Sequence, residues 1–486
     1  MKKIVIVGAG SSGLIAAAMM KNYWGDLVDI SVYYDKSNKN IAVGESTTPI
    51  IRLLLRHLGM TTQDLFQELK TGATMKLGIQ FKDWIPGTEY HHGFGQIYMD
   101  PYTNSSAIYS IPENKFNGGQ NYSEPTFTIP DAPFEEYDHA FHIDTQEFSD
   151  LIFKKLEGRV NFIDTRIKDV VSDGENIISL TTEDDEIVTA DFFVDCSGFS
   201  TLLFKHLNPK WNDFSKYLPL DRAIAQQVPH KFMKLPAFTM AEATDNGWTW
   251  KIPIGDRYGT GYIYSSKFVS DDEAREKYDA WLFKNFKKHL DTDRIIRYRP
   301  GYYDEYYIGN CIAVGLSSGF VEPLESTGLQ IIIQQVQEFM TINSTLLNMN
   351  HNRKLLNQGN KRLYTDIFNF ICLHYNTDRT DSEFWRYMTS NKTDWVKDFD
   401  TKCRQEHFDS RTCGGAKAFW GLDSWVQVCH GLNMITNDSI KNFLVSKIDS
   451  EMISLQAKED DRYQKEEKKR VKSISHKKVL DIIHSH

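Results

Sequence analysis

Ile4-Val5-Ile6-Val7-Gly8-Ala9-Gly10-Ser11-Ser12-Gly13 is the stretch that decides the fold, because it joins a short apolar run to a G-x-G-x-x-G loop. An apolar run of this length is typical of a strand buried on both faces of a parallel sheet. The residues that follow, 14–20, are rich in helix formers. In a strand–loop–helix unit the glycines let the backbone approach a pyrophosphate, and the helix N-terminus faces it. The sequence therefore predicts a dinucleotide-binding α/β domain with a doubly wound, Rossmann-like sheet.

Two later strands are also predicted to end in glycine turns. They lie at residues 191–198 and 311–315. The strand expected at 29–35 ends in Asp35, the only candidate for binding an adenosine ribose. A ligand that takes contacts from such distant segments must be long, which favours FAD over a nicotinamide dinucleotide. We therefore expect an FAD-binding domain of the GR2/hydroxylase type with a mixed sheet.

The character of the sequence changes after about residue 330. Residues 334–340 and 385–388 have helical patterns, and few strand signals follow. We expect residues 1–345 to form the FAD-binding domain, including strands on the substrate side. Residues 346–486 should form a mainly helical lobe that covers the substrate site. Residues 458–486 are dense in charge, which predicts a solvated helix.

Composition excludes several classes of function. The chain has 486 residues, a net charge of −9 and 41% hydrophobic residues, which is ordinary for a soluble globular protein. No basic cluster beside aromatic residues indicates nucleic-acid binding, and no apolar run is long enough for a bilayer. The N-terminus leads into the glycine loop without a signal peptide. The six cysteines form no C-x-x-C pair, so a reduced, cytoplasmic protein without a structural metal is expected.

A second distinctive stretch is Gly247-Trp248-Thr249-Trp250-Lys251-Ile252-Pro253. Positions i and i+2 of a strand share a face, so Trp248 and Trp250 are expected side by side. Pro253 cannot donate to a ladder, which predicts that the strand is at a sheet edge or ends there. Two interpretations stay open: a pair of core tryptophans, or an aromatic wall that keeps a substrate away from a reactive centre.

Taken together, these motifs resemble those of the flavin-dependent halogenases, most closely the tryptophan-halogenase branch, almost end to end. The paired-tryptophan motif is the most specific, since ordinary flavin monooxygenases lack it. The other matching segments are Gly44–Pro49, Ala140–Asp144, Asp195–Phe199, Gly259–Ser266, Val321–Gly328, and His374-Tyr375 with Arg379, Asp381, Phe384 and Trp385. The resemblance implies that reduced FAD, dioxygen and a halide (chloride, bromide or iodide) make hypohalous acid, which travels through the protein to a small aromatic substrate. A separate flavin reductase would supply the reduced FAD.

The resemblance implies catalytic roles for Lys76, Glu325 and Ser326. Lys76 has apolar neighbours, so a buried lysine with a lowered pKa is expected. It would either hydrogen-bond hypohalous acid or form a haloamine. Glu325 would orient the electrophile or take the proton that the ring loses. Without the resemblance, Glu325 would be interpreted as an acid that stabilises a helix N-terminus. Ser326 resembles the serine that holds the lysine.

Binding residues are implied in the same way. The halide is expected on the backbone N–H groups of Thr327 and Gly328, because adjacent amides form an anion nest. The residues expected around the arene are Ile79, His92, Phe94, Phe419 and Trp420. Those expected around FAD are Gly8, Gly10, Ser11, Ser12, Gly13, Asp35, Ala42, Gly44, Glu45, Ser46, Thr47, Gly198, Gly315 and Leu324.

The amino-acid clamp of the tryptophan enzymes is not matched. Counted without gaps from Phe419, the positions that carry two adjacent tyrosines, a glutamate and an asparagine in those enzymes carry Phe408, Asp409, Gly415 and Ser424 here. We therefore expect the arene slot to be kept and the clamp for the ammonium and carboxylate to be lost. This predicts an indole-type or other electron-rich arene as substrate rather than free tryptophan.

Two other functions compete with halogenation. A single-component aromatic hydroxylase would need substrate access to the flavin, and the Trp248 and Trp250 wall argues against that access. The other alternative is a non-catalytic FAD-binding protein descended from a halogenase. The retention of Lys76 and Glu325 argues against it.

Overall fold

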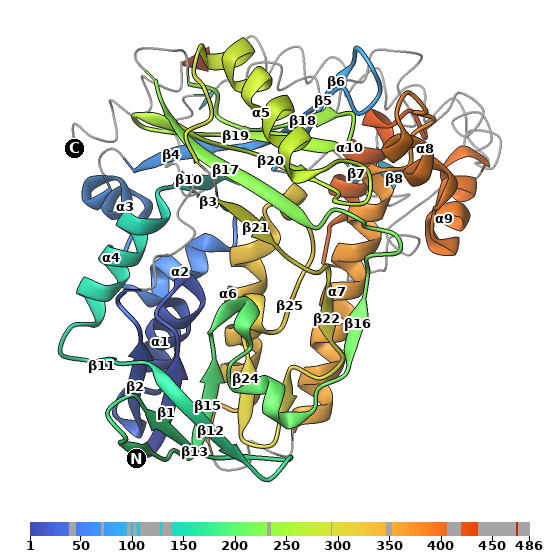
Figure 1. Cartoon of the computed structure of the whole chain (residues 1–486). Coiled ribbons are helices and arrows are strands. Elements are labelled where there is room, and N and C mark those ends of the chain that lie inside the picture. The colour runs from blue at the N-terminus through green and yellow to red at the C-terminus, as the bar shows by residue number, and fades with distance from the viewer. Residues whose placement is uncertain are drawn as a thin grey trace.

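The computed structural model describes residues 1–37, 45–69, 72–94, 99–100, 105–106, 127–128, 139–230, 235–292, 294–346, 352–405, 419–435 and 473–474. Two large sheets dominate this part of the chain. In the view of Figure 1 the sheet that contains β1 lies below the sheet that contains β19. Helices of the C-terminal third lie beside both sheets.

The six-stranded sheet is the dinucleotide-binding sheet that the glycine loop predicts. Its order is β11 (Asn161–Asp164), β2 (Val28–Tyr34), β1 (Lys2–Val7), β15 (Phe192–Asp195), β24 (Cys311–Ala313) and β23 (Tyr307–Ile308). Neighbouring strands are parallel except for the edge strand β23. The mixed α/β sheet is therefore confirmed, and the strands predicted within residues 4–7, 29–35, 191–198 and 311–315 are present.

The two faces of this sheet are covered differently. Ile4 and Ile6 of β1 pack against α1 (Ser11–Trp24), α4 (Thr145–Leu156) and α6 (Thr327–Ile342). Val5 and Val7, which alternate with them, pack against a small antiparallel sheet of β12 (Ile167–Ser172), β13 (Ile177–Thr182) and β14 (Ile187–Val188). Both faces are buried, which explains why the strand residues are continuously apolar.

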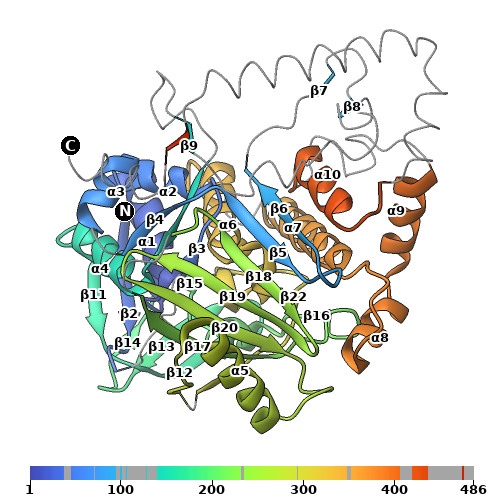
Figure 2. The same ribbon diagram turned by 90° about the horizontal axis from the view of Figure 1, so that it is seen from above.

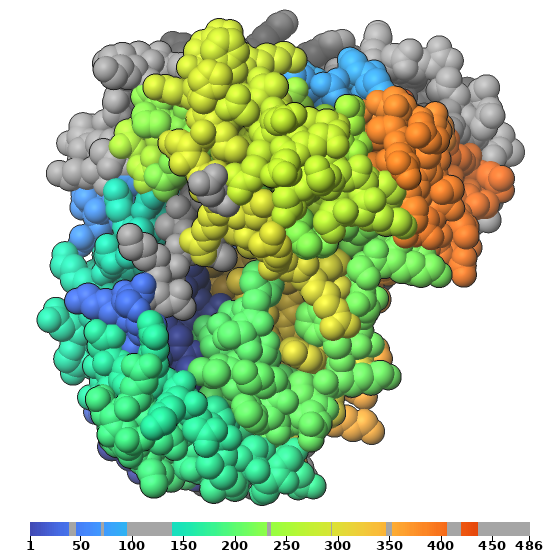
Figure 3. All heavy atoms as spheres, viewed as in Figure 1, coloured from blue at the N-terminus to red at the C-terminus, as the bar shows by residue number. Residues whose placement is uncertain are grey.

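The seven-stranded sheet carries the paired tryptophans. Its order is β21 (Ile295–Arg297), β17 (Arg222–Pro229), β20 (Arg257–Tyr264), β19 (Gly247–Ile254), β18 (Thr239–Thr244), β5 (Gly78–Lys82) and β6 (Glu89–Gly93). Pro253 is the penultimate residue of β19, which lies between β18 and β20. Of the two predictions for Pro253, the strand end is therefore correct and the sheet edge is not. Helix α5 (Asp271–Phe286) packs on the outer face and forms part of the surface seen in Figure 3.

A three-stranded sheet lies close to both large sheets. Its order is β3 (Glu45–Ser46), β10 (Ala140–Ile143) and β4 (Ala73–Lys76), and both pairings are antiparallel. β10 contacts β19 of the seven-stranded sheet, and α2 (Ile51–His57) and α3 (Thr62–Glu68) pack beside it. A further small sheet joins β16 (Trp211–Asp213), β22 (Gly301–Tyr303) and β25 (Gly319–Phe320).

The last third of the described chain is helical. It contains α7 (Arg353–His374), α8 (Glu383–Ser390), α9 (Asp394–Gln405) and α10 (Leu422–Gly431), and Figure 2 shows α10 beside β6. The Gly93 backbone N–H donates to Gln427 Oε1 at 2.7 Å, and Gln427 Nε2 donates to the Gly93 carbonyl at 3.2 Å. This side chain therefore joins α10 to the edge strand β6. The helices predicted at 334–340 and 385–388 are confirmed.

Two sequence predictions have other outcomes. The boundary at 345/346 falls between α6 and α7, and the division into two domains stays a prediction. Of residues 458–486 the structure describes Ser473–Ile474, which form β26 paired with β9 (Phe127–Thr128). The predicted helix is wrong at these two residues, because backbone pairing with a distant segment replaces local charge patterning there. The remaining short pairing joins β7 (Met99–Asp100) to β8 (Ser105–Ser106).

Neither a membrane-spanning helix nor a metal-binding cluster is present in the described residues. None of the helices described is long and apolar enough to cross a bilayer. Within the same ranges no cluster of histidine, cysteine and carboxylate side chains has the arrangement of a metal site. Five cysteines of this part are buried and form no disulfide, and Cys413 lies outside it.

Candidate active site

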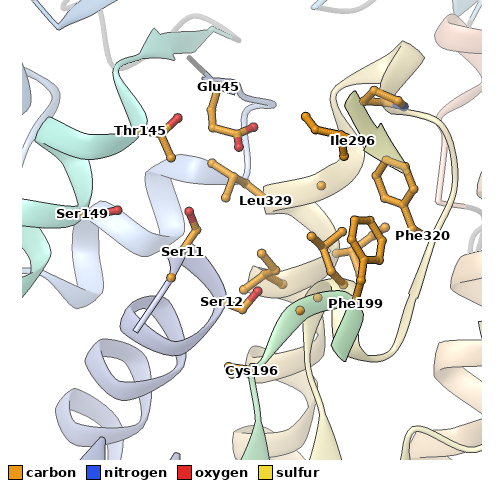
Figure 4. A pocket seen from close by; sticks show the side chains of 18 of the residues that line it. Ser11, Ser12, Glu45, Thr145, Ser149, Cys196, Phe199, Ile296, Phe320 and Leu329 are labelled. Atoms are coloured by element: carbon orange, nitrogen blue, oxygen red, sulfur yellow. The ribbon is translucent and has the colours of Figure 1, made fainter. Parts of the chain in front are cut away.

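A cavity of about 1070 Å³ lies where the carboxyl ends of the six-stranded sheet meet the seven-stranded sheet. This volume is at the upper end of the range of small-molecule sites, so the cavity suits a long ligand. Figure 4 shows Ser11 and Ser12 at the start of α1, with Thr145 and Ser149 of α4 on one side. Phe199 and Phe320 lie on the other side, with ring centroids 5.7 Å apart.

The glycines of the loop make the close backbone approach that the motif predicts. Gly8 has φ +107°, and a Cβ there would lie 2.4 Å from the Cys196 carbonyl oxygen. A Cβ on Gly13 would lie 1.8 Å from the Gly8 carbonyl oxygen. Gly315 has φ +64°, and its Cβ would lie 2.3 Å from Ser12 Oγ. The three glycine segments that the sequence singled out therefore meet at one end of the cavity.

Most residues predicted for FAD line this cavity. They are Gly8, Gly10, Ser11, Ser12, Asp35, Glu45, Ser46, Gly198, Gly315 and Leu324. Gly13 does not line the cavity but packs beneath the loop, and Thr47 points to β10, where Thr47 Oγ1 donates to the Phe141 carbonyl at 2.8 Å. Ala42 and Gly44 lie outside the described residues. The sequence analysis did not identify Thr145 and Ser149 of α4 as lining residues. The available signal was two small polar residues spaced i and i+4, which share one face of a helix.

Asp35 follows the end of β2, as expected of an acid that binds a ribose. Its carboxylate accepts hydrogen bonds from the Ser37 hydroxyl at 2.6 Å and from Arg166 Nε at 2.6 Å. The Ser37 hydrogen bond and then Arg166 lower the pKa of Asp35, so it is ionised at the cavity rim. Two hydroxyls of a ribose are neutral donors that suit such a carboxylate.

The arrangement fits FAD on grounds of shape and donors. The N-terminus of α1 and the crowded glycines offer backbone N–H groups to a pyrophosphate. An acid lies at the end of the second strand, and the far side of the cavity is apolar and aromatic, as a ring system requires.

Trp248 and Trp250 lie side by side on one face of β19, as predicted. Their ring centroids are 6.1 Å apart, and both residues line the cavity while being largely buried. They belong at the same time to the core cluster that continues into α7. Both interpretations of the pair therefore have a basis: the tryptophans are core residues whose exposed edges form a cavity wall.

Lys76 is at the end of β4, is fully buried, and lies beside Ser326 of the cavity lining without lining the cavity itself. Its Nζ donates to the Thr47 carbonyl at 2.8 Å and to Ser326 Oγ at 3.0 Å. It also lies 5.2 Å from the centroid of the Phe94 ring. Burial lowers the pKa of Lys76 to about 7, although Glu325 opposes the shift. A buried lysine with a lowered pKa is thus present, as the sequence predicts.

Glu325 is buried between two histidines. Its Oε2 lies 2.8 Å from His92 Nδ1, and its Oε1 lies 2.7 Å from His374 Nε2. Burial alone would raise its pKa, but the two histidines outweigh that effect and lower the pKa of Glu325 to about 2. The interpretation of Glu325 as an acid that only stabilises a helix N-terminus is therefore incomplete. Its carboxylate contacts one histidine from β6 and one from α7.

The predicted arene residues gather around this carboxylate. His92 and Ile79 are paired across β6 and β5, and the His92 ring centroid is 5.8 Å from that of Trp420. Phe419 packs edge-on against Trp420 at 4.8 Å. The sequence reasoning missed Phe370, whose ring stacks on Trp420 at 4.3 Å and lies one helical turn before His374. The i, i+4 spacing of Phe370 and His374 was the available signal.

The predicted halide residues open helix α6. Ser326 has φ 60° and ψ 32°, which turns the chain into the left-handed region just before Thr327. Thr327 is buried, whereas Gly328 lines the cavity with open space around its Cα. Free N–H groups at the start of a helix of 16 residues make this an electropositive end.

Of the unmatched clamp positions, Ser424 is on α10, and Phe408, Asp409 and Gly415 lie outside the described residues.

Comparisons with known proteins agree with this arrangement. A family model described as tryptophan halogenase matches residues 3–445. The tryptophan 7-halogenase RebH of Lentzea aerocolonigenes is 32% identical over 428 residues, which cover 79% of this chain and 78% of that protein. BrvH, a flavin-dependent halogenase from Brevundimonas sp. BAL3, is similar in structure with a TM-score of 0.81 and 25% identity over 99% of both chains. A tryptophan halogenase from Shewanella frigidimarina NCIMB 400 has a TM-score of 0.86 at 22% identity, covering 100% of this chain and 98% of that chain, a likeness of fold.

Proposed function

The chain belongs to the tryptophan halogenase family of flavin-dependent halogenases, and on that premise we propose that it halogenates an electron-rich arene of the indole type rather than free tryptophan. The observation that carries the proposal is the buried ammonium of Lys76. It lies outside the cavity lining, beside Phe94 and close enough to Glu325 for the carboxylate to oppose the lowering of its pKa. The alternative functions would have no use for a buried lysine outside the cofactor cavity.

The cofactor side is supplied by the residues around the cavity. The glycine loop and α1 would hold the FAD pyrophosphate, Asp35 the ribose, and Trp248 and Trp250 would bound the ring system. Reduced FAD, when bound, supplies the chemistry that turns dioxygen and a halide into hypohalous acid. The N-terminus of α6 would hold the halide anion through the N–H groups of Thr327 and Gly328.

Lys76 would present the halogen to the arene. A lysine that is fully buried and has a pKa of about 7 exists partly as a neutral amine near neutral pH. As an ammonium it would hydrogen-bond hypohalous acid and make the halogen more electrophilic; as an amine it would form a haloamine. Ser326 and the Thr47 carbonyl hold the nitrogen in place for either role.

Glu325 would accept the proton that leaves the halogenated ring. Two histidines hold this carboxylate in its ionised form within a buried site, where an acceptor is needed. Because both carboxylate oxygens are already engaged, Glu325 would act in concert with His92, whose ring also faces Trp420.

The substrate part of the proposal rests on what surrounds the arene slot. His92, Phe94 and Trp420 supply aromatic surface, which any arene can use. The sequence lacks the charged and polar clamp of the tryptophan enzymes at Phe408, Asp409, Gly415 and Ser424. An ammonium or carboxylate that loses water without gaining a partner costs about 1–3 kcal/mol or more. A neutral arene avoids this cost.

A separate reductase would supply the reduced cofactor. The motifs for FAD are complete in this chain, and no sequence motif for a second, nicotinamide-binding domain accompanies them. The chain alone with NADPH should therefore leave FAD oxidised, whereas added flavin reductase should start turnover.

The test supplies a flavin reductase, NADH, FAD and bromide, and compares indole with L-tryptophan. Brominated indole formed at a kcat/KM at least about tenfold above that for tryptophan is expected, because about 1.4 kcal/mol corresponds to tenfold. A tenfold preference for tryptophan would overturn the substrate assignment. Hydroxylated indole would identify a monooxygenase instead, and FAD binding without any product would identify a non-catalytic flavoprotein.

A further inference from the structure

Trp420 is held differently from the other rings around Glu325. His92 and His374 are hydrogen-bonded to the carboxylate at 2.8 and 2.7 Å, and Phe370 is part of α7. Trp420 lies just before α10, outside the helices and strands of the described chain. Its indole Nε1 is buried and has no hydrogen-bond partner among the described residues. The position of this ring therefore depends on stacking and on how its backbone is held.

Stacking fixes only part of the position of the indole. The centroid of the Trp420 ring lies 4.3 Å from that of Phe370, with 24° between the ring planes, and 5.8 Å from that of His92. Stacked aromatic rings attract each other at more than one lateral offset. The contact with Phe370 therefore orients the plane of the indole more firmly than it fixes the place of the ring within that plane. A second constraint is needed to keep Trp420 beside His92.

Asp366 supplies a constraint on the backbone. The Phe419 backbone N–H donates to Asp366 Oδ2 at 3.2 Å. Asp366 and Phe370 are four residues apart on α7 and so lie on one face of that helix. Phe419 and Trp420 are consecutive in the chain. One face of α7 therefore holds this segment at two neighbouring points, the backbone of Phe419 through Asp366 and the ring of Trp420 through Phe370.

The surroundings of Asp366 favour this hydrogen bond. Asp366 and Phe419 are both half-buried. Burial raises the pKa of Asp366, whereas the Phe419 N–H and then Arg362 oppose the shift. Electrostatic interactions are stronger where the surroundings are less polar than water, so this bond is stronger than the same bond at an exposed side chain.

We propose that Asp366 is a positioning residue of the arene slot: by accepting the Phe419 N–H it keeps the Phe419–Trp420 pair against Phe370, and thereby sets how tightly the slot holds an arene. Asp366 acts on the substrate through Trp420. The inference rests on the proposed function, in which Trp420 supplies aromatic surface to the arene. Asp366 lies in none of the segments that carry the family resemblance.

The role predicted for Asp366 concerns binding rather than chemistry. Among the contacts described for Asp366, none involves Lys76 or Glu325. An aromatic surface beside the slot stabilises the bound arene before and during the reaction alike. Loss of such uniform binding raises KM and leaves kcat unchanged. A displaced Trp420 should therefore be seen in KM.

The experiment compares Asp366→Ala with Asp366→Asn. Asparagine keeps an oxygen that can accept the Phe419 N–H but carries no charge, whereas alanine keeps no acceptor. Alanine is the best helix former, so α7 should not weaken through loss of helix propensity. Asp366→Leu is a second variant without an acceptor, used in the same way if Asp366→Ala does not fold.

Thr365→Ala is the matched control on the same helix. Thr365 is the exposed neighbour of Asp366, and its Oγ1 donates to the Lys361 carbonyl at 2.7 Å. Its loss changes α7 locally without touching the Asp366 anchor. Trp420→Ala sets the upper limit of the expected effect, because it removes the ring that Asp366 is inferred to position.

Steady-state bromination of indole gives the first readout. Asp366→Ala should raise KM at least about threefold, the scale of one aromatic contact, with kcat within about twofold of the wild type. Asp366→Asn and Thr365→Ala should resemble the wild type. Asp366→Ala combined with Trp420→Ala should have the KM of Trp420→Ala alone, because a residue that acts through Trp420 adds nothing once that ring is gone.

Three results would overturn the assignment. They are a KM in Asp366→Ala equal to that of the wild type, an Asp366→Asn variant as poor as Asp366→Ala, and effects of Asp366→Ala and Trp420→Ala that add in the double variant. The second would mean that the charge of Asp366 matters rather than its bond to Phe419. The third would mean that Asp366 acts on the arene independently of Trp420.

A second readout uses the cofactor-free chain and separates this inference from the proposed function. The ten tryptophans are labelled with fluorotryptophan, and the ¹⁹F resonance of Trp420 is assigned by its absence in Trp420→Phe. Phe370→Leu removes the stacked ring and gives the resonance of an unstacked Trp420. Asp366→Ala should move the resonance towards that position, and Asp366→Asn should not.

The two readouts fail in different ways. A Trp420 resonance that stays in place in Asp366→Ala overturns the anchor, even where indole is brominated efficiently. A resonance that moves as expected in a protein whose wild type halogenates no arene keeps the anchor and overturns the proposed function.

Discussion

Trp250 and Gly261 face each other across β19 and β20, and the indole occupies the space that a side chain at 261 would need. A Cβ on Gly261 would lie 1.9 Å from Trp250 Cη2, 2.2 Å from Cζ2 and 2.5 Å from the Ile224 carbonyl oxygen. The glycine is therefore part of the tryptophan wall, because the ring can lie flat against β20 only where that strand has no side chain.

Gly261→Ala should destabilise the fold by about 1–3 kcal/mol, as overpacking of a rigid core does, and should displace the Trp250 ring. Urea unfolding with tryptophan fluorescence measures both effects. Gly359→Ala in α7 is the matched control: its Cβ meets only the mobile tip of Glu338, at 3.0 Å. Alanine at this position inside a helix should raise the free energy of unfolding by about 0.5–1 kcal/mol. Equal stability of Gly261→Ala and the wild type would show that the ring relocates freely.

Lys76→Met should lower halogenation about a hundredfold or more, the scale of a lost acid–base or positioning group, while reduced flavin is still oxidised and hypohalous acid is still released. Methionine has a similar length and no charge to bury, so the fold should not weaken. Product mass spectrometry, with the released acid trapped, makes the measurement.

Lys76→Arg separates the two roles left open for the lysine. A guanidinium donates hydrogen bonds but does not lose its proton in proteins. Retained halogenation in Lys76→Arg would indicate hydrogen-bonded hypohalous acid, whereas an inactive variant that still folds would indicate the amine.

Glu325→Gln should weaken the fold at neutral pH, by an amount that shrinks in acid. The two histidines lower the pKa of Glu325 to about 2, against about 4.3 in an unfolded chain. The stabilisation by the carboxylate is therefore fully present above about pH 4.3 and is lost as the pH falls towards 2. Urea midpoints of wild type and variant from neutral pH to the acid limit of folding give the difference. A difference that stayed constant in acid would mean that the histidines do not hold the carboxylate in its charged form.

Glu322→Gln should have the opposite pH signature. Glu322 is buried three residues before Glu325, accepts a hydrogen bond from the Tyr375 hydroxyl at 2.6 Å, and has a pKa that burial raises to about 8. The folded chain keeps this proton while the unfolded chain loses it above about pH 4.3, so folding is penalised increasingly between these two values. The variant has no such penalty. Its stability relative to wild type should therefore rise with pH by an amount on the order of a few kcal/mol, and a flat difference would contradict a neutral Glu322.

Local patterns sufficed for the parts of the site that lie within one strand or one turn. The apolar run before Gly8, the shared face of Trp248 and Trp250, and the apolar neighbours of Lys76 all follow from sequence spacing. Pro253 was ambiguous because a proline that ends a central strand and one at an edge have the same sequence.

The rest depended on contacts between distant segments, which periodicity does not encode. Glu325 is held by His92 from β6 and His374 from the end of α7, and no local pattern relates the three positions. His142 of β10 is paired with Ser46 of β3 and with Thr74 of β4, which requires the register of two ladders at once. The resemblance to a known family identified the segments that carry these residues. It did not show which of the residues are in contact.

The two hydrogen bonds between Gln427 and Gly93 bear on how this protein can be re-engineered. The amide of Gln427 satisfies the N–H and the carbonyl of a single edge residue, as the next strand of the sheet would. A helical lobe transplanted from another halogenase would have to bring an amide to this point, or it would leave one position of β6 open to pairing with a second chain. Chimaeras between relatives are therefore more promising when the crossover keeps α10 and β6 from the same parent.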